Sequence, residues 1–573
     1  MGIKAVTLTL PDVHKLPARK MSMTLTLRSD RERETRYVPK ATLILTLLIS
    51  TALTDDRVVV STTEGKYVAA ARAFSEETVD VFLGIPYAKP PVGELRFLKP
   101  QPVSPWEGAY DATAMKDSCM QPRVPWVFEI PTALSEDCLY LNVWTPRASE
   151  TAKLPVLVWF YGGIYKVGSA YETRYNAAPL VALNDVVVVS CNFRSAMFGY
   201  LNADDEGAPG NVGLWDQLMV MQWVQRNARA FGGDPDLVTL FGESSGSMAI
   251  HLHLLSPLTA GLFRRVFFMS GTQNTDADVD SVWESIRTGN AVAEALGCAN
   301  PFQDLTTHPD KVLQCLRKCS ASEIAEATEN VTSPNMLAFL PTFNTEFVPY
   351  LPSIAAEKRL FRVVEALVSV VSNEGAFAFV MQPDKELLQD DLSGYDWENF
   401  VPAVRTVAGE FVKKRVFPLA VDYLQDAQAK DKAAFRQAAA DFVGKNHFYC
   451  SSRLFSENES GINGKVYGMV FAHRSRKSTM PEWTKVVHMQ EIPYFFGIPF
   501  LDSVNYDEED QQVSLEAMRI LTSFARDGKP NAPNATKWTP FSTEEPYFMW
   551  LEPRNYSMTN FFEGHACDLW RRF

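Results

Sequence analysis

A serine with the surroundings of a nucleophile lies in a G-x-S-x-G pattern formed by Gly242, Ser244 and Gly246. The pattern follows an apolar, strand-like run at 238–241 and precedes a helix-compatible segment at 247–255. A serine on such a tight strand-to-helix turn is presented for attack, and small residues two positions away leave room for the turn. The helix N-terminus offers backbone N–H groups to an oxygen that gains negative charge. We therefore predict Ser244 as a nucleophile, with an ordinary glycine-rich turn as the alternative.

A serine hydroxyl needs a general base, and the base needs a carboxylate to orient it. In one known chain order the acid follows the serine and the histidine follows the acid. Glu374 fits as the acid because it comes directly after the apolar run 363–371, in a turn that ends at Gly375. Candidate bases downstream are His447, His473, His488 and His565. His488 is favoured because apolar neighbours can hold its ring rigid, although a structural role for it stays open.

A second glycine-rich turn predicts the site that stabilises the oxyanion. The apolar run 156–161 leads into Gly162, Gly163, Ile164 and Tyr165. Glycines let the backbone approach an acyl oxygen closely, so N–H groups of Gly163 and Ile164 are candidate donors. The N–H of Ser245 is the third. A simple Gly-Gly hairpin is the alternative interpretation.

Apolar and helix-like segments alternate along most of the chain. The strand-like runs are 156–161, 186–191, 238–241, 266–269 and 363–371, and helical periodicity appears at 214–230 and 515–526. Such alternation predicts an α/β protein with a large, mostly parallel central sheet and helices on both faces. No linker divides the body, so we expect one domain over residues 54–573 after a targeting segment at 1–53.

The composition is that of a globular protein, with 46% hydrophobic and 21% charged residues among 573. The net charge of −13 argues against nucleic acid as a partner, because such binding relies on lysine and arginine. The same charge is compatible with cationic substrates. A homo-oligomer is possible, and the sequence does not decide the oligomeric state.

The N-terminal segment has the features of a signal peptide. Basic residues between 28 and 40 precede an apolar run at 41–53. That run is of about a dozen residues, short for a membrane span and suited to a signal h-region. Because the preceding basic region is long, Met21 or Met23 is an alternative start, and a signal anchor is the alternative function. No later run is long enough to cross a membrane, so we expect a secreted, extracellular protein.

Secretion gives meaning to the eight cysteines and to the glycosylation sequons. Disulfides are expected in an extracellular chain, although spacing alone does not give their pairing. The four sequons are at Asn330, Asn458, Asn534 and Asn555.

Several stretches in order resemble the type-B carboxylesterase/cholinesterase family over nearly the whole chain after residue 53. They are 82–97, 135–144, 210–217, 231–235, the pattern around Ser244, and 473–488, which is particularly similar to cholinesterases. The resemblance implies the α/β-hydrolase fold and hydrolysis of a small-molecule carboxylic ester. It implies Ser244, Glu374 and His488 as the triad and Ser270 as a supporting residue. It implies no metal and no organic cofactor.

The resemblance also implies pairings that spacing leaves open. The implied disulfides are Cys119–Cys138, Cys298–Cys315 and Cys450–Cys567, and the implied ion pairs are Arg96–Glu136 and Arg194–Asp216. Cys191 lies in a buried-strand run and is expected to be a packed free thiol. Cys319 is left over, and its competition with Cys315 for Cys298 stays open.

The chain departs from the family pattern at the oxyanion loop and in the pocket. Ile164 stands where the family usually has a third glycine, and a β-branched side chain prefers extended backbone angles. The pocket candidates are Trp126, Phe128, Glu243, Phe339 and Phe377, of which Trp126 or Phe128 would face a quaternary ammonium group. The tryptophan expected near Ala277 in an acyl pocket is absent. Core packing is the alternative role for these aromatic residues.

We therefore expect a secreted serine hydrolase that cleaves carboxylic esters through an acyl-enzyme intermediate. A choline ester hydrolase is the first alternative. A catalytically weak binding or adhesion protein on the same fold is the second, and Ile164 is the observation in its favour.

Overall fold

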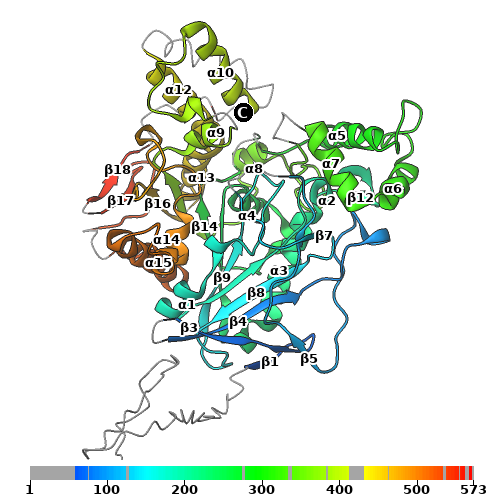
Figure 1. Ribbon diagram of the computed structural model, residues 1–573. Helices are drawn as coiled ribbons and strands as arrows, with labels where there is room; N and C mark the ends of the chain where they lie inside the picture. The colour runs from blue at the N-terminus through cyan, green and yellow to red at the C-terminus, as the bar shows by residue number, and fades with distance from the viewer. Residues whose placement is uncertain are drawn as a thin grey trace, which may run out of the picture. The chain divides into compact units, whose positions relative to one another are not determined.

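The apolar runs become strands of one central sheet in the computed structural model (Figure 1). The sheet has 11 strands, in the order β18-β17-β16-β15-β14-β13-β9-β10-β8-β4-β3. Their bounds are β3 (Ala70–Phe74), β4 (Glu77–Pro86), β8 (Tyr140–Thr145), β9 (Leu154–Phe160), β10 (Val187–Cys191), β13 (Gly233–Glu243), β14 (Arg265–Met269), β15 (Glu365–Val371), β16 (Lys465–Phe471), β17 (Phe548–Glu552) and β18 (Asn555–Thr559).

The structure describes part of the chain. The described residues are 58–74, 77–123, 128–273, 276, 278–332, 338–382, 385–411, 431–462, 464–532, 537–553, 555–561, 567, 568 and 570. The expected signal segment, the start alternatives within it, Trp126, Asn534 and His565 lie outside them.

The central strands run parallel, as the alternation of strands and helices predicts. Strands β10, β9, β13, β14, β15, β16 and β17 pair in parallel. The edges differ: β8, β4 and β3 on one side and β18 on the other join antiparallel. The sheet is therefore mostly parallel at its centre and antiparallel at both edges.

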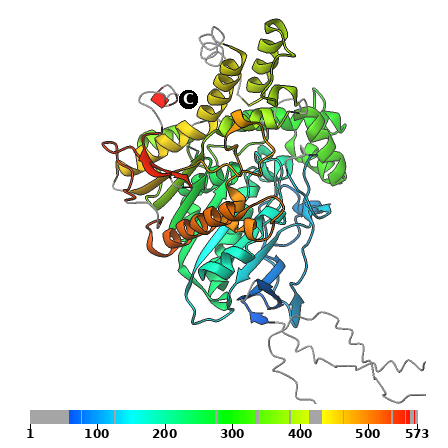
Figure 2. The same cartoon turned by 60° about the vertical axis from the view of Figure 1, so that its left-hand side comes forward.

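Helices cover both faces of this sheet. The longer ones are α1 (Ala178–Asn184), α3 (Val212–Asn227), α4 (Ser245–Leu255), α5 (Val282–Ala295), α6 (Pro309–Lys318), α7 (Ala321–Thr332), α8 (Pro352–Lys358), α10 (Trp397–Glu410), α12 (Lys432–Gly444), α13 (Cys450–Ser460) and α15 (Glu508–Asp527), and the shorter ones are α2 (Ala196–Tyr200), α9 (Phe377–Val380) and α14 (Ile492–Phe496). Helices α1, α14 and α15 pack on one another, and α15 lies in front of the strands in Figure 2. Helices α3 and α4 pack against β13. No described helix has the length and apolar character of a membrane span.

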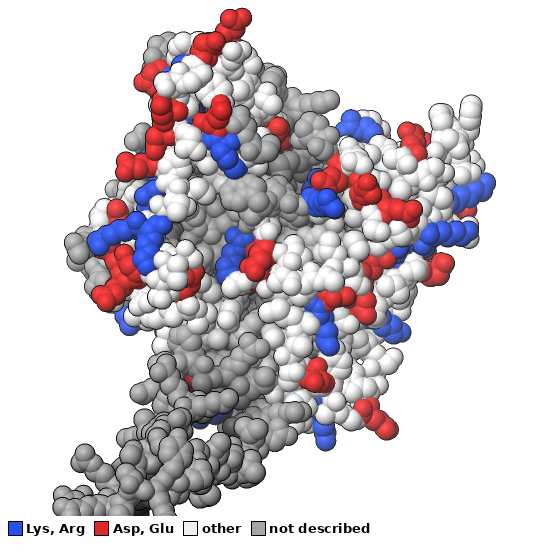
Figure 3. Space-filling view, in the orientation of Figure 1, with Lys and Arg blue, Asp and Glu red and all other residues white. Residues whose placement is uncertain are grey.

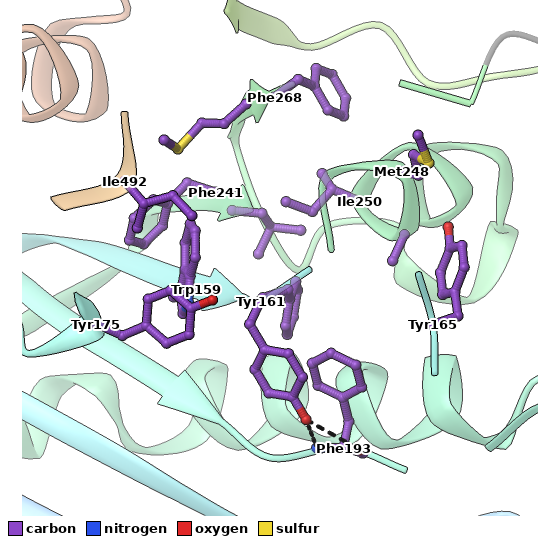
Figure 4. Packing of buried hydrophobic residues seen from close by; sticks show 14 of the residues in the cluster. Trp159, Tyr161, Tyr165, Tyr175, Phe193, Phe241, Met248, Ile250, Phe268 and Ile492 are labelled. Carbon is purple, nitrogen blue, oxygen red and sulfur yellow. Dashed lines mark hydrogen bonds between the residues drawn. The ribbon is translucent and has the colours of Figure 1, made fainter. Parts of the chain in front are cut away.

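Aromatic packing fixes the two strands that lead to the predicted site. Trp159 of β9 lies 4.8 Å from Phe241 of β13 and 5.1 Å from Tyr175, measured between ring centroids (Figure 4). Phe496 of α14 closes the cluster at 5.0 Å from Trp159. Aromatic pairs in this geometry contribute about 0.5–1.5 kcal/mol each beyond their buried area. Strands β9 and β13 are thus held side by side where their carboxyl ends lead into the loops that carry the predicted site residues.

All three implied disulfides are formed, between Cys119 and Cys138, Cys298 and Cys315, and Cys450 and Cys567. Cys191 is a buried free thiol, as expected. Cys319 is free as well, and its Sγ lies 3.8 Å from that of Cys298.

Both implied ion pairs are also formed. Arg96 binds Glu136 through two contacts of 2.6 Å, and Arg194 binds Asp216 through contacts of 2.8 and 2.7 Å. On the face shown in Figure 3, acidic and basic side chains are interspersed rather than gathered by sign.

We predict that the Arg194–Asp216 pair stabilises the fold far more than an exposed pair does. Asp216 is fully buried, so Asp216→Asn leaves the Arg194 charge without its counter-charge in a place that water does not reach. Breaking such a pair costs about 3–5 kcal/mol of unfolding free energy. Denaturant titration of the purified protein measures the change.

Glu346→Gln is the matched control, because Glu346 pairs with Lys99 in an exposed position. Exposed pairs contribute about 1 kcal/mol or less. Equal losses in the two variants would show that burial does not set the contribution of the pair.

Candidate active site

Ser244 occupies a strained turn between β13 and α4. Its φ of 56° and ψ of −130° are rarely adopted by residues other than glycine. The glycines around it permit a close backbone approach: a Cβ on Gly242 would lie 2.7 Å from the Phe160 carbonyl oxygen, and one on Gly246 would lie closer still. A Cβ on Gly162 would meet the Ser244 side chain at 2.8 Å. Glycine is therefore needed on both sides of Ser244, because the end of β9 and the turn after β13 are in direct backbone contact.

Glu374 and His488 are joined by a short hydrogen bond. Nδ1 of His488 lies 2.7 Å from Oε2 of Glu374, and both residues are buried. The other carboxylate oxygen of Glu374 accepts the N–H of Val371 at 2.8 Å. A bridge between Asn373 and Val487 holds the two loops together. Glu374 thereby fixes both the position of the imidazole and the nitrogen that carries its proton.

The second nitrogen of His488 faces a different carboxylate. Nε2 lies 3.0 Å from Oε1 of Glu243, the residue before Ser244. This contact is close but poorly directed, since neither oxygen of Glu243 accepts a well-formed hydrogen bond from the described residues. Within the described part of the chain, no hydrogen bond joins the Ser244 hydroxyl to His488. Burial lowers the pKa of His488, but Glu243 and Glu374 outweigh it and raise the pKa to about 10.

A third buried carboxyl group lies beside this pair. The Ser270 hydroxyl donates to Oε1 of Glu491 at 2.8 Å, and Glu491 is fully buried. Burial, with smaller contributions from Glu243 and Glu374, raises the pKa of Glu491 to about 8. Glu491 is therefore largely a neutral acid at pH 7, and the Ser270 hydroxyl is bound to it.

The oxyanion loop keeps a positive φ at the two residues that follow its glycines. Ile164 and Tyr165 have φ values of 60° and 57°, and a positive φ is a genuine outlier for a β-branched residue. The Tyr165 N–H is not available to an oxyanion, because it donates to the Ser245 hydroxyl at 3.1 Å. Among the described contacts, the N–H groups of Gly163, Ile164 and Ser245 have no protein acceptor, so they remain available to an oxyanion.

These groups line one pocket, whose empty space of about 550 Å³ includes open solvent. Its lining includes Ser244, His488, Gly163, Ile164 and Ser245 together with Tyr165, Met248, Asp278, Leu340, Met381, Phe411, His447, Phe448 and Met489. A nucleophile, a histidine and free N–H donors on one wall form a site suited to attack on an acyl carbon.

The four described pocket candidates lie differently relative to this space. Phe128 and Phe377 line the pocket, and Phe377 lies 5.1 Å from the His488 ring. Phe339 is buried but does not line the pocket, and its neighbour Leu340 does. Glu243 does not line the pocket and contacts His488 instead.

The remaining candidates are His473 and the asparagines of the described sequons. His473 binds Asp510 at 2.7 Å, outside the Ser244 pocket. Among the described sequons, Asn330 and Asn555 are exposed and Asn458 is half-buried in α13.

Sequence reasoning missed Glu491 and the Asp278–His447 pair as pocket or support residues. Glu491 follows His488 by three positions, and an acid so near a candidate base was a usable signal. Nothing in the sequence connects Asp278 with His447, because 169 positions separate them.

Comparison with known proteins agrees with this geometry. The model of the carboxylesterase family matches residues 56–570. An acetylcholinesterase of Leptinotarsa decemlineata is 32% identical over 547 residues, covering 90% of this chain and 86% of that protein. The family match extends over the central sheet, the turn that carries Ser244 and the loops that carry Glu374 and His488. The chain therefore belongs to the carboxylesterase family and is an ester hydrolase.

Proposed function

We propose that the protein is an extracellular serine esterase that cleaves small carboxylic esters through an acyl-enzyme intermediate. The observation that carries the proposal is the convergence of Ser244, the His488–Glu374 pair and the free N–H groups of the oxyanion loop on one pocket. Three disulfides support an extracellular location, because such bonds persist in oxidising compartments.

In the proposed reaction Ser244 attacks the acyl carbon while His488 takes its proton. Glu374 holds the imidazole and stabilises its charged form. The N–H groups of Gly163, Ile164 and Ser245 bind the oxygen that becomes negative, and His488 then protonates the leaving alcohol. Water, activated by His488, releases the acid and restores Ser244.

Choline esters are the less favoured substrate class for this pocket. Phe128 is the described aromatic candidate for a quaternary ammonium group, but the Arg174 guanidinium already lies 5.8 Å from its ring centroid. A second cation would meet repulsion there, which weakens the cation–π argument.

Covalent labelling and substitution test Ser244 as the nucleophile. An organophosphate should label Ser244 and no other serine, and Ser244→Ala should lower kcat/KM on 4-nitrophenyl butanoate at least about a thousandfold. Peptide mass mapping and steady-state kinetics measure the two effects. Circular dichroism of the variant controls for folding. Retained turnover in a folded Ser244→Ala protein would refute the assignment.

The contact between Glu243 and His488 predicts a shifted pH profile. His488 acts as a base only when it is unprotonated, so a raised pKa moves the acid limb of kcat/KM to higher pH. Glu243→Gln removes one of the charges that raise this pKa. The acid limb should then move to lower pH by about one unit or more.

Glu459→Gln is the matched control for the pH profile. Glu459 is also buried, and burial raises its pKa to about 7, but it binds the Val364 N–H rather than His488. Its replacement should leave the acid limb in place. An unmoved limb in Glu243→Gln would show that the Glu243 contact is absent from the active enzyme.

The strained oxyanion loop predicts that glycine in place of Ile164 raises kcat. Ile164→Gly removes a β-branched side chain from a positive-φ position and lets the N–H turn toward the tetrahedral oxygen. We expect kcat on small esters to rise about tenfold, with a smaller change in ground-state binding.

Asp185→Gly is the control for this gain. Asp185 also has a positive φ, 50°, at the end of α1 and away from the pocket. Glycine there relieves backbone strain without touching the site, so kcat should not change. An unchanged kcat/KM in folded Ile164→Gly would mean that the loop is already productive.

A further inference from the structure

One part of the Ser244 pocket is polar although most of its lining is apolar. Asp278, between β14 and α5, and His447, in the π-helical turn Lys445–Tyr449, both line the pocket and are buried. Nδ1 of His447 lies 3.0 Å from Oδ1 and 3.1 Å from Oδ2 of Asp278. The pair is separate from His488 and Glu374, so the proposed reaction gives it no role.

The contacts of His447 indicate which ligand groups the pair accepts. Its Nε2 lies 2.5 Å from the Phe411 carbonyl oxygen, beside the Asn446 amide. Nδ1 faces the Asp278 carboxylate, and Nε2 faces the Phe411 carbonyl oxygen and the Asn446 amide nitrogen, so neither ring nitrogen is left for a ligand. Burial lowers the pKa of His447, but the Asp278 charge outweighs it and raises the pKa above its ordinary value.

Asp278 retains capacity to accept hydrogen bonds. Its two carboxylate oxygens offer about four acceptor positions. Among the described residues its only partner is Nδ1 of His447. The raised pKa of His447 favours the protonated ring, which balances the charge of the carboxylate, so the pair suits a neutral hydrogen-bond donor better than a cation.

A buried hydroxyl group without a partner lies in the same pocket. Tyr165 is 4% exposed, lines the pocket, and has no hydrogen-bond partner for its hydroxyl among the described residues. Figure 4 shows it beside Met248, another lining residue. Burial, with contributions from Tyr200 and Asp278, raises the pKa of Tyr165, so the hydroxyl stays protonated. It can both donate and accept a hydrogen bond.

We propose that Asp278 and Tyr165 form a subsite for a hydroxyl group on the acyl chain of the substrate. The ligand hydroxyl donates to the Asp278 carboxylate and accepts from the Tyr165 hydroxyl. This inference rests on the proposed function. His488 must protonate the leaving oxygen, so the leaving group lies on its side, and the acyl chain extends toward Tyr165, which follows Ile164 of the oxyanion loop.

Matched pairs of 4-nitrophenyl esters test the subsite. The pairs are 3-hydroxybutanoate with butanoate and 6-hydroxyhexanoate with hexanoate, each rate being corrected for hydroxide hydrolysis. In the wild type we expect kcat/KM to favour the hydroxylated member of at least one pair about tenfold. Asp278→Asn should lower this ratio about tenfold and Tyr165→Phe about threefold.

Tyr200→Phe is the matched control. The Tyr200 hydroxyl is also buried without a described partner, and its ring lies 5.3 Å from that of Tyr165, but it does not line the pocket. This variant should keep the wild-type ratio. A ratio reduced equally in Tyr200→Phe and Tyr165→Phe would mean that general loosening causes the effect, and would overturn the subsite.

Three further outcomes test this inference, and two of them separate it from the proposed function. If Ser244-dependent hydrolysis of the plain esters is seen without a hydroxyl preference in either pair, the subsite is wrong and the esterase proposal stands. If 6-aminohexanoate is preferred over 6-hydroxyhexanoate, the neutral-donor assignment is overturned. If no ester is hydrolysed through Ser244, both proposals fail.

Discussion

The direct backbone contact between the end of β9 and the turn after β13 determines where the whole site lies. Gly242 and Gly246 have no room for a Cβ against the Phe160 carbonyl oxygen, so any side chain there would separate the strands. The same contact places the oxyanion loop, which continues from β9, opposite Ser244. The aromatic cluster around Trp159 holds the two strands at this distance. Catalytic geometry thus depends on core packing some distance from the reacting atoms.

Charge is the second constraint, because Glu243, Glu374 and Glu491 are all buried around one imidazole. Burial, with smaller contributions from Glu243 and Glu374, raises the pKa of Glu491 to about 8. Glu491 carries a proton at pH 7, while Glu243 and Glu374 share the His488 cation. Substrate entry that moves His488 from Glu243 toward Ser244 would return the ring to the role of base. Glu243 therefore sets how readily the base becomes available.

Much of the fold was predictable from sequence, because it depends on local patterns. The roles of Ser244, Glu374 and His488 stay predictions, and the Glu374–His488 contact that they require is present. Apolar runs identified the central strands, although β13 begins at Gly233 where its first residues look like a turn. Helix α15 begins at Glu508, earlier than expected, because a capping box with Asp507 supports a polar first turn. The antiparallel edge strands were not predicted. Asp278 and His447 were missed as partners because only the folded chain brings them together.

Positive φ values at residues other than glycine occur over much of the described chain, and several of these residues lie at the pocket. Ile164, Tyr165, Ser244, Ser270 and Met489 all have positive φ, and all but Ser270 line the pocket. Each such residue costs about 1–3 kcal/mol, so the surrounding structure must hold them in place. Disulfides and buried ion pairs elsewhere supply stability that offsets this cost. Ile164 is the β-branched residue of this set, and a positive φ is least tolerated in such a residue, so its strain acts directly on the backbone that carries a candidate oxyanion donor.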